Sequence, residues 1–146
     1  MKTRVRDLKD IDLHSITPAH CSASLLWLSN ISRKEKWGLS EAEQCELLGG
    51  WSIEIYRQMI SLSLSGNLVA LDEDRIIRLS LLLKFHKLLD SLSPQTMDAS
   101  VLFNRVNSGY FLKGASIREY LLKDASLERF LALIDYLETA IADRYS

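Results

Sequence analysis

Histidine, cysteine and serine are the residue types in this chain that could support catalysis or metal binding. His14, His20 and His86 lie far apart and lack the short intervals that bring two ring nitrogens to one metal ion. Cys21 and Cys45 do not form a C-x-x-C pair. No serine stands in a G-x-S-x-G or S-x-x-K motif. The sequence therefore predicts no catalytic, metal or cofactor site, and a protein that is not an enzyme.

These residues have structural interpretations instead. Two cysteines that stay reduced and pack as small apolar side chains are typical of the cytoplasm, where we expect this protein. His86 follows Phe85 in an apolar helical segment, so we expect it to be partly buried. Gly109 and Gly114 flank an aromatic loop without the Gly-Lys-Ser/Thr ending of a phosphate-binding loop. The loop aromatics are expected to pack onto the helices or to form part of a partner surface.

Composition sets the fold class. Of the 146 residues, 47% are hydrophobic and only two are proline, which favours long helices around a core over many short strands. The sequence predicts an all-α fold. The net charge of −1 is balanced along the chain, whereas nucleic-acid binders usually carry a basic face. No uncharged run approaches the roughly 20 residues needed to span a bilayer, so no membrane partner is expected.

Three regions are expected along the chain: a tail or arm over 1–17, a helix-turn-helix-like region over 18–66 and a second helical domain over 67–146. Thr17-Pro18 predicts the start of a helix that reaches about residue 36. Ser40 and Glu43 form a capping box for a short helix that ends at Gly49-Gly50. Ser52 caps the next helix, whose expected inner face is Ile53, Ile55, Tyr56, Met59 and Ile60.

A serine- and leucine-rich stretch that ends at Gly66-Asn67 is the expected linker. An apolar central helix is predicted over 72–92, with one narrow polar stripe. Thr96 is expected to cap a helix over 97–106. Ser116 and Glu119 form a second capping box for a helix to about residue 123, and the last helix is predicted over 126–143.

The helix-turn-helix-like region offers little charge for DNA. Ser52, Arg57 and Gln58 are the side chains that could contact DNA from its second helix, and Glu54 opposes them. A structural helix pair and a DNA reader both fit this pattern.

The order of these segments resembles the Xre/MbcA/ParS-type antitoxins from Trp37 onward. The similar stretches are 36–49, 71–89, 107–114, 116–120 and 135–138. The resemblance implies the antitoxin of a type II toxin–antitoxin pair, whose C-terminal domain covers the active-site entrance of a RES-type toxin that acts on NAD. It also implies possible repression of the shared promoter. Carried over by position, the toxin-facing residues are Asn107, Phe111, Gly114, Ser116, Glu119, Tyr136 and Leu137.

The chain differs from that family at several places. Phe103 and Val106-Asn107 stand where the family has Trp and Pro-Asn, and Ile134-Asp135 stand where it has Arg. The second helix of the turn begins Trp51-Ser-Ile-Glu, without the small polar and basic residues usual there. A solitary DNA-binding regulator without a toxin is the alternative function. Under both, the apolar central helix predicts a homodimer.

Overall fold

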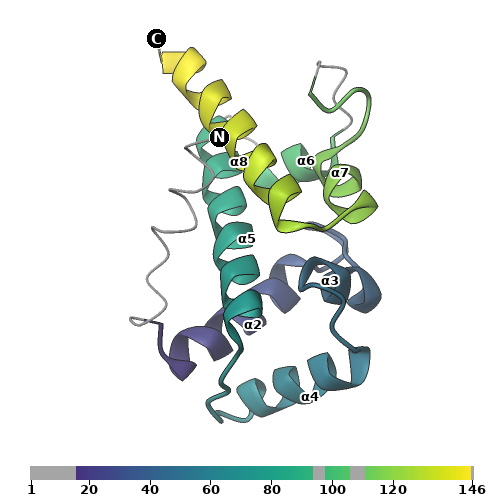
Figure 1. Ribbon diagram of the computed structural model, residues 1–146, viewed down its shortest axis with the longest axis vertical. Helices are drawn as coiled ribbons and strands as arrows, with labels where there is room; N and C mark the ends of the chain where they lie inside the picture. Colours follow the sequence, from purple (N-terminus) through teal and green to yellow (C-terminus); the bar gives the residue numbers. More distant parts are fainter. Residues whose placement is uncertain (1–15, 94–97, 106–110, 146) are drawn as a thin grey trace.

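Seven α-helices and no strand occur in the part of the chain that the computed structural model describes, residues 16–93, 98–105 and 111–145 (Figure 1). This confirms the all-α prediction. The helices are α2 (Pro18–Ile31), α3 (Glu41–Leu47), α4 (Ile53–Leu64), α5 (Glu73–Leu92), α6 (Ala99–Asn104), α7 (Ile117–Lys123) and α8 (Leu127–Tyr145).

Hydroxyl side chains cap four of these helices, Thr17 at α2 and serines at α3, α4 and α7. Ser40 Oγ accepts a hydrogen bond from the Glu43 amide at 3.1 Å, and the Glu43 carboxylate accepts one from the Ser40 amide at 2.9 Å. Ser116 and Glu119 make the same reciprocal pair at 3.0 and 2.9 Å. Ser52 Oγ accepts from an amide of the first turn of α4 at 3.1 Å. Both predicted capping boxes and the Ser52 cap are confirmed, and each satisfies backbone donors that a helix leaves open.

Three predicted boundaries are wrong. α2 ends at Ile31 rather than near residue 36, because the chain turns back there to bury Trp37, whose amide donates to the Ile31 carbonyl at 2.8 Å. α4 continues to Leu64, into the linker expected over residues 63–67. α6 begins at Ala99 with Asp98 as its N-cap, so Thr96 is not the cap, and Thr96 itself lies outside the described residues.

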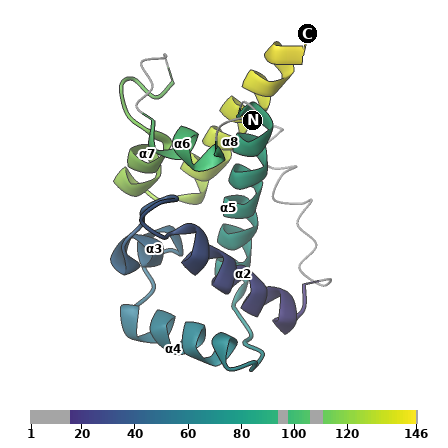
Figure 2. The same cartoon turned by 180° about the vertical axis from the view of Figure 1, so that it is seen from behind.

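α5 is the central element of the arrangement. α8 packs along its C-terminal part, and α2 crosses it near its start (Figures 1 and 2). α4 packs against α2 on the side away from α8, whereas α6 and α7 lie beside one another near α8. The helices therefore form a lower group (α2, α3, α4) and an upper group (α6, α7, α8) joined by α5.

An aromatic stack fills the centre of the core. Trp37 lies flat on Phe103 with ring centroids 4.0 Å apart, and Phe85 meets Phe130 edge-on at 5.5 Å. His86 is half-buried beside Trp37 at 6.4 Å, which confirms its expected structural position. Both cysteines are free and buried, also as expected. Ile55, expected on the inner face of α4, is instead 41% exposed.

Two arginines connect the lower and upper groups. Arg78 of α5 is 11% exposed; it pairs with Asp74 at 3.0 Å and donates to the carbonyls of Leu47 and Ala125. Arg118 of α7 donates to both carboxylate oxygens of Glu43 on α3, at 2.8 and 2.7 Å. Because these side chains use their charge on fixed partners, they position the two groups relative to each other.

Candidate partner-binding surface

The residues expected to face a toxin occupy different depths. Phe111 and Tyr136 are half-buried, and Gly114 is exposed with a φ of +88° that favours glycine. Ser116 is buried and, with Glu119, is used as a helix cap. Leu137 is 2% exposed and belongs to the core. Asn107 lies outside the described residues.

Four side chains of the upper group form what we call the aromatic cluster: Phe111, Tyr120, Arg129 and Tyr136. Phe111 stacks on Tyr136 with centroids 4.7 Å apart and an interplanar angle of 11°. The same ring lies 5.1 Å from Tyr120. The rings come from the loop before α7, from α7 and from α8, so the cluster holds three segments together. Each side chain keeps part of its surface open to solvent.

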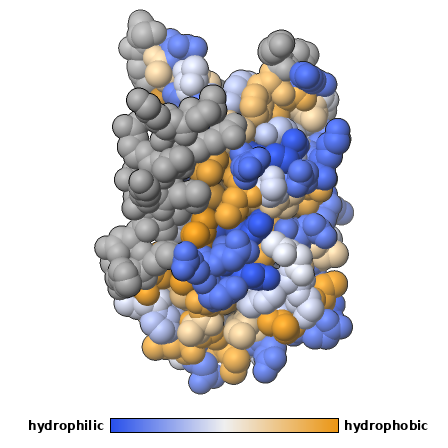
Figure 3. Space-filling view, in the orientation of Figure 1, coloured by the Kyte–Doolittle hydropathy of each residue, from blue (hydrophilic) through white to orange (hydrophobic). Residues whose placement is uncertain are grey.

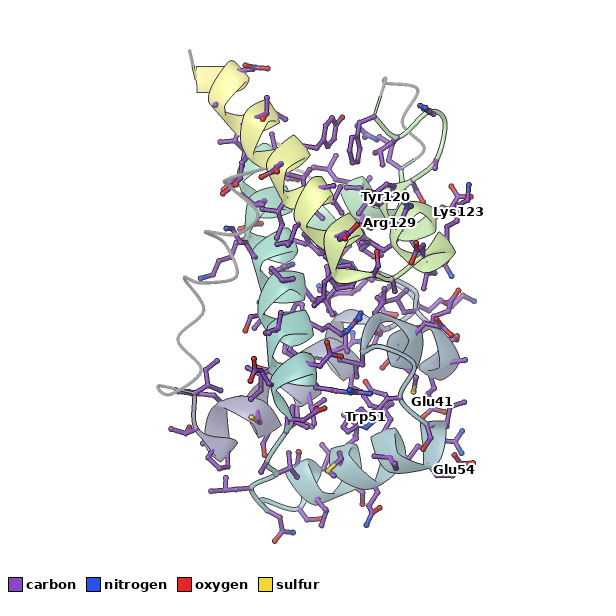
Figure 4. The ribbon with its side chains drawn as sticks, viewed as in Figure 1. Glu41, Trp51, Glu54, Tyr120, Lys123 and Arg129 are labelled. Carbon is purple, nitrogen blue, oxygen red and sulfur yellow. The ribbon has the colours of Figure 1, made fainter. Side chains whose placement is uncertain are left out.

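Arg129 places a positive charge on this cluster. Its guanidinium carbon lies 3.8 Å from the Tyr120 ring centroid, within the range of a cation–π contact. Its Nη2 also donates to the Tyr120 carbonyl at 2.7 Å. Figure 4 shows the two side chains approaching each other between α7 and α8, while Lys123 points outward from the end of α7. The positive charge is therefore held by a ring face and a carbonyl, neither of which neutralises it.

An open pocket of about 240 Å³ adjoins the cluster through Tyr136. Its other walls include Leu89, Leu92, Leu102, Arg105 and Leu112. Figure 3 shows an apolar area at the upper right of this face, over the loop that precedes α7. An aromatic rim, a positive charge and an apolar recess suit the insertion of an apolar or aromatic side chain from a protein partner.

The side chains expected to contact DNA lie on the lower group. Ser52 is used as the α4 cap, and Gln58 is exposed. Arg57 donates to both carboxylate oxygens of Glu41, at 2.6 to 3.1 Å. This hydrogen-bonded pairing lowers the pKa of Glu41 and raises that of Arg57. The guanidinium therefore lies beside a carboxylate at an exposed position, where a phosphate would have to compete with Glu41.

Tyr56 anchors the same helix beneath this pair. Its ring is buried, and its hydroxyl donates to the side-chain oxygen of Gln44 on α3. Burial raises the pKa of Tyr56 well above its usual value, so the phenol stays neutral. The ring centroids of Trp51 and Tyr56 are 6.3 Å apart, and the guanidinium carbon of Arg75 lies 5.7 Å from the Trp51 ring centroid. Glu41 and Glu54, labelled in Figure 4, place acidic groups at this end of the molecule.

Two residues of the aromatic cluster, Tyr120 and Arg129, were not among the expected site residues. Tyr120 closes one of the segments that resemble the antitoxins, and Arg129 stands in the first turn of α8. The sequence signal that could have found them is a tyrosine in one short helix followed by an arginine in the first turn of the next. Their contact depends on the turn between α7 and α8, which spacing alone does not define.

The described ranges hold neither a metal-binding cluster nor a membrane-spanning helix. No three His, Cys, Asp or Glu side chains there are grouped so as to hold a metal ion. None of the helices described is long and apolar enough to cross a membrane. Comparison of the chain with models of protein families, with curated proteins and with solved structures finds no match. The antitoxin resemblance therefore remains a prediction from the residues quoted above.

Proposed function

We propose that this chain is the antitoxin of a type II toxin–antitoxin pair and binds its toxin through the aromatic cluster. The observation that carries the proposal is the block of half-open rings of Phe111, Tyr120 and Tyr136 with Arg129 stacked at one end. Tyrosine and arginine are enriched among the residues that dominate binding free energy. Large, rigid side chains bury much area at a small cost in conformational entropy.

The proposed partner is a cytoplasmic RES-type toxin that acts on NAD. In this proposal the chain is not an enzyme: it neutralises the toxin by covering the entrance to its active site. The rings and the adjoining apolar pocket would receive side chains at the rim of that entrance. The cation of Arg129 would face acidic groups, since charge complementarity sets the orientation of an interface.

Co-expression with the adjacent reading frame tests this proposal. We expect the neighbour alone to arrest growth and to lower cellular NAD, and co-expression of this chain to restore both. The two proteins should then purify together through a tag on either one. The proposal is contradicted if the product of the adjacent reading frame is harmless. It is also contradicted if that product is toxic but this chain neither binds it nor restores growth.

Promoter binding by α3 and α4 is a weaker part of the proposal, and a solitary DNA-binding regulator is its alternative. The exposed Gln58 and the two-glycine turn before α4 favour DNA contact. The pairing of Arg57 with Glu41 opposes it. Binding to upstream DNA that weakens steeply with salt supports the regulator, because phosphate contacts release counterions. Absence of binding at low salt removes it.

We also propose a homodimer, and place its contact on α4. Apart from Val101, the large apolar side chains that the described residues expose lie on α4 or shortly after it: Ile55, Leu62, Leu64 and Leu68. An exposed group of this kind is typical of a surface that pairs with another protein. Sedimentation at micromolar concentration should give a dimer, and Leu64→Asp with Leu68→Asp should give the 16.6 kDa monomer. A wild-type monomer contradicts the assignment.

A further inference from the structure

Two adjoining recesses lie between α2 and α4, and together we call them the α2–α4 groove. Their volumes are about 330 and 210 Å³, and they share the walls Ser29, Ile60 and Leu64. Leu26 is a further apolar wall of the larger recess. α4 lies below α2 in both ribbon views (Figures 1 and 2), so the groove is at the other end of the molecule from the aromatic cluster.

Charged side chains are scarce on the two helices that form the groove. α2 has no Asp, Glu, Lys or Arg among its 14 residues, and α4 has two among its 12, Glu54 and Arg57. In the whole chain, by contrast, 25% of the residues are charged. Near the end of α4, Leu62 and Leu64 are 37% and 72% exposed. Few charges beside exposed leucines are typical of the core of a protein interface rather than of a solvated helix pair.

The groove and an apolar side chain that projects beside it belong to the same patch. Leu64 is a wall of both recesses, and it is the most exposed large apolar side chain in the part of the chain that the structure describes. In a two-fold interface between identical copies, each copy offers both the projecting side chain and the recess that receives it. This patch offers both, whereas a partner of another sequence would need only the recess.

The charges of the groove are compatible with a second copy. Among the described residues, the charged walls are Arg33, Glu41 and Arg57. Arg57 is paired with Glu41 at 2.6 Å, and Arg33 with the exposed Glu35 at 2.8 Å. Their exposed neighbours also differ in sign: Lys34 and Glu54. Because these charges cancel, the patch does not repel a copy of itself, and it does not attract a strongly charged partner.

We infer that a second copy of this chain binds in the α2–α4 groove, with Leu64 of each copy inserted between Leu26 and Ile60 of the other. This placement rests on the homodimer proposed above and specifies its contact, and it does not depend on the toxin. Since Arg57 is a wall of the groove, the second copy also covers it. Pairing of two copies and DNA contact by Arg57 therefore exclude each other.

Sedimentation of the full chain tests this inference with one variant for each side of the contact. Leu64→Asp removes the inserted side chain, and Ser29→Trp fills the groove where its two recesses meet. We expect each to raise the dimer Kd about 30-fold, as for the loss of a dominant contact. The matched controls are Leu68→Asp, at a 66% exposed position outside the groove, and Ser91→Trp, on the exposed surface of α5. Each control should change the Kd less than about twofold.

A mixture of the two variants tests whether the insertion is reciprocal. In a mixed pair, Leu64 of the Ser29→Trp copy still meets the open groove of the Leu64→Asp copy, so one of the two contacts survives. Neither variant keeps a contact with itself. We expect the mixed dimer to be about tenfold tighter than either variant alone, with circular dichroism confirming that both are folded. If Ser29→Trp does not fold, Asn30→Trp, at an exposed wall of the larger recess, replaces it.

The outcomes separate this inference from the proposals on which it rests. A wild-type monomer overturns both the inference and the homodimer. If Leu68→Asp dissociates the dimer while folded Ser29→Trp does not, the groove is wrong and a homodimer through the exposed leucines stands. A mixture that is no tighter than its components also overturns the inference. Growth rescue in the co-expression experiment tests the toxin partner separately from all of these results.

Discussion

Two arginines in this protein, Arg57 on α4 and Arg129 on α8, have opposite surroundings. Arg57 is exposed and donates to both oxygens of Glu41, so its charge is cancelled by an acid on the neighbouring helix. Arg129 rests on the face of Tyr120 and donates to a neutral carbonyl, so its charge is retained within a group of half-open rings. The same residue type thus serves to join helices in the lower group and to present charge in the upper group.

This contrast is one of surface chemistry, because the local structure of the two ends is similar. Capping boxes of similar geometry begin α3 and α7, and Arg118 and Glu43 join those two helices. Local structure is therefore alike in both places. What distinguishes them is what the remaining side chains leave open: an exposed Glu41–Arg57 ion pair beside apolar side chains near α4, and half-open rings with one arginine near α8.

The largest expected effect is the loss of partner binding from the aromatic cluster. Phe111→Ala and Tyr136→Ala should each weaken binding of the neighbour's product about 30-fold, the factor that corresponds to a residue worth about 2 kcal/mol. Titration calorimetry on the purified pair measures this. Arg57→Ala is the control on the lower group and should leave the affinity as it was. Equal losses for Arg57→Ala and Phe111→Ala would remove the distinction between the regions.

The connection between the regions gives the next largest effect. Arg78→Leu should lower the free energy of unfolding by about 2 to 3 kcal/mol, because three buried or half-buried acceptors lose a charged donor. Urea unfolding followed by circular dichroism and by tryptophan fluorescence measures it. Arg78→Lys keeps the charge and should cost less. A loss below ~0.5 kcal/mol would show that Arg78 does not couple the two groups.

A smaller effect, with a defined pH dependence, is expected at α6. Asp98 caps this helix by accepting from the Ser100 amide at 2.9 Å, which holds its pKa below the usual 3.8. The pKa of Asp98 is therefore lower in the folded state than in the unfolded state. The charged cap stabilises the fold above the unfolded-state pKa, and this stabilisation is lost as the pH falls through the folded-state pKa. Asp98→Ala should cost about 1 kcal/mol at pH 7.

The difference in free energy of unfolding between wild type and Asp98→Ala should shrink as the pH is lowered from 5 toward 3. This is the window that the depressed carboxylate pKa defines. Urea midpoints at several pH values measure it. A difference that stays constant over this range would mean that the carboxylate charge does not act at the helix start.

The smallest effect concerns the lower group and DNA. Glu41→Gln releases Arg57 and removes one negative charge, so binding to upstream DNA should become tighter and more dependent on salt. Fluorescence anisotropy at several salt concentrations measures both changes. Glu46→Gln removes the same charge from an exposed position of α3 and is the matched control. If both variants behave alike, net charge rather than release of Arg57 explains the change.

Local features of the fold could be predicted from the sequence because they depend on neighbouring residues. A hydroxyl three positions before a glutamate predicts a capping box, and Ser40 and Ser116 confirm it. Thr17 is also a cap, but His20 completes its box with a ring nitrogen instead of a carboxylate, which the usual pattern does not include. The end of α2 was missed because burial of Trp37 determines it, and burial is a property of the whole fold.

Contacts between distant segments were the part that spacing could not predict. Phe111 and Tyr136 were both expected at a surface, yet their stacking depends on how α8 packs on α5. Ile55 fits the inner face of α4 by periodicity, but α2 covers only part of that face and leaves it exposed. The pairing of Arg57 with Glu41 likewise joins two helices across a glycine turn, and it changes how the α4 surface is interpreted.

Hydrogen exchange of this chain, alone and with the purified product of the neighbouring reading frame, tests the central claim most directly. The account predicts that the partner slows amide exchange in residues 111–123 and 129–140, around the aromatic cluster, and leaves residues 52–62 of the α4 segment unchanged. Protection confined to α3 and α4, or no protection at all beside a tight complex, would contradict the assignment of partner binding to the upper group.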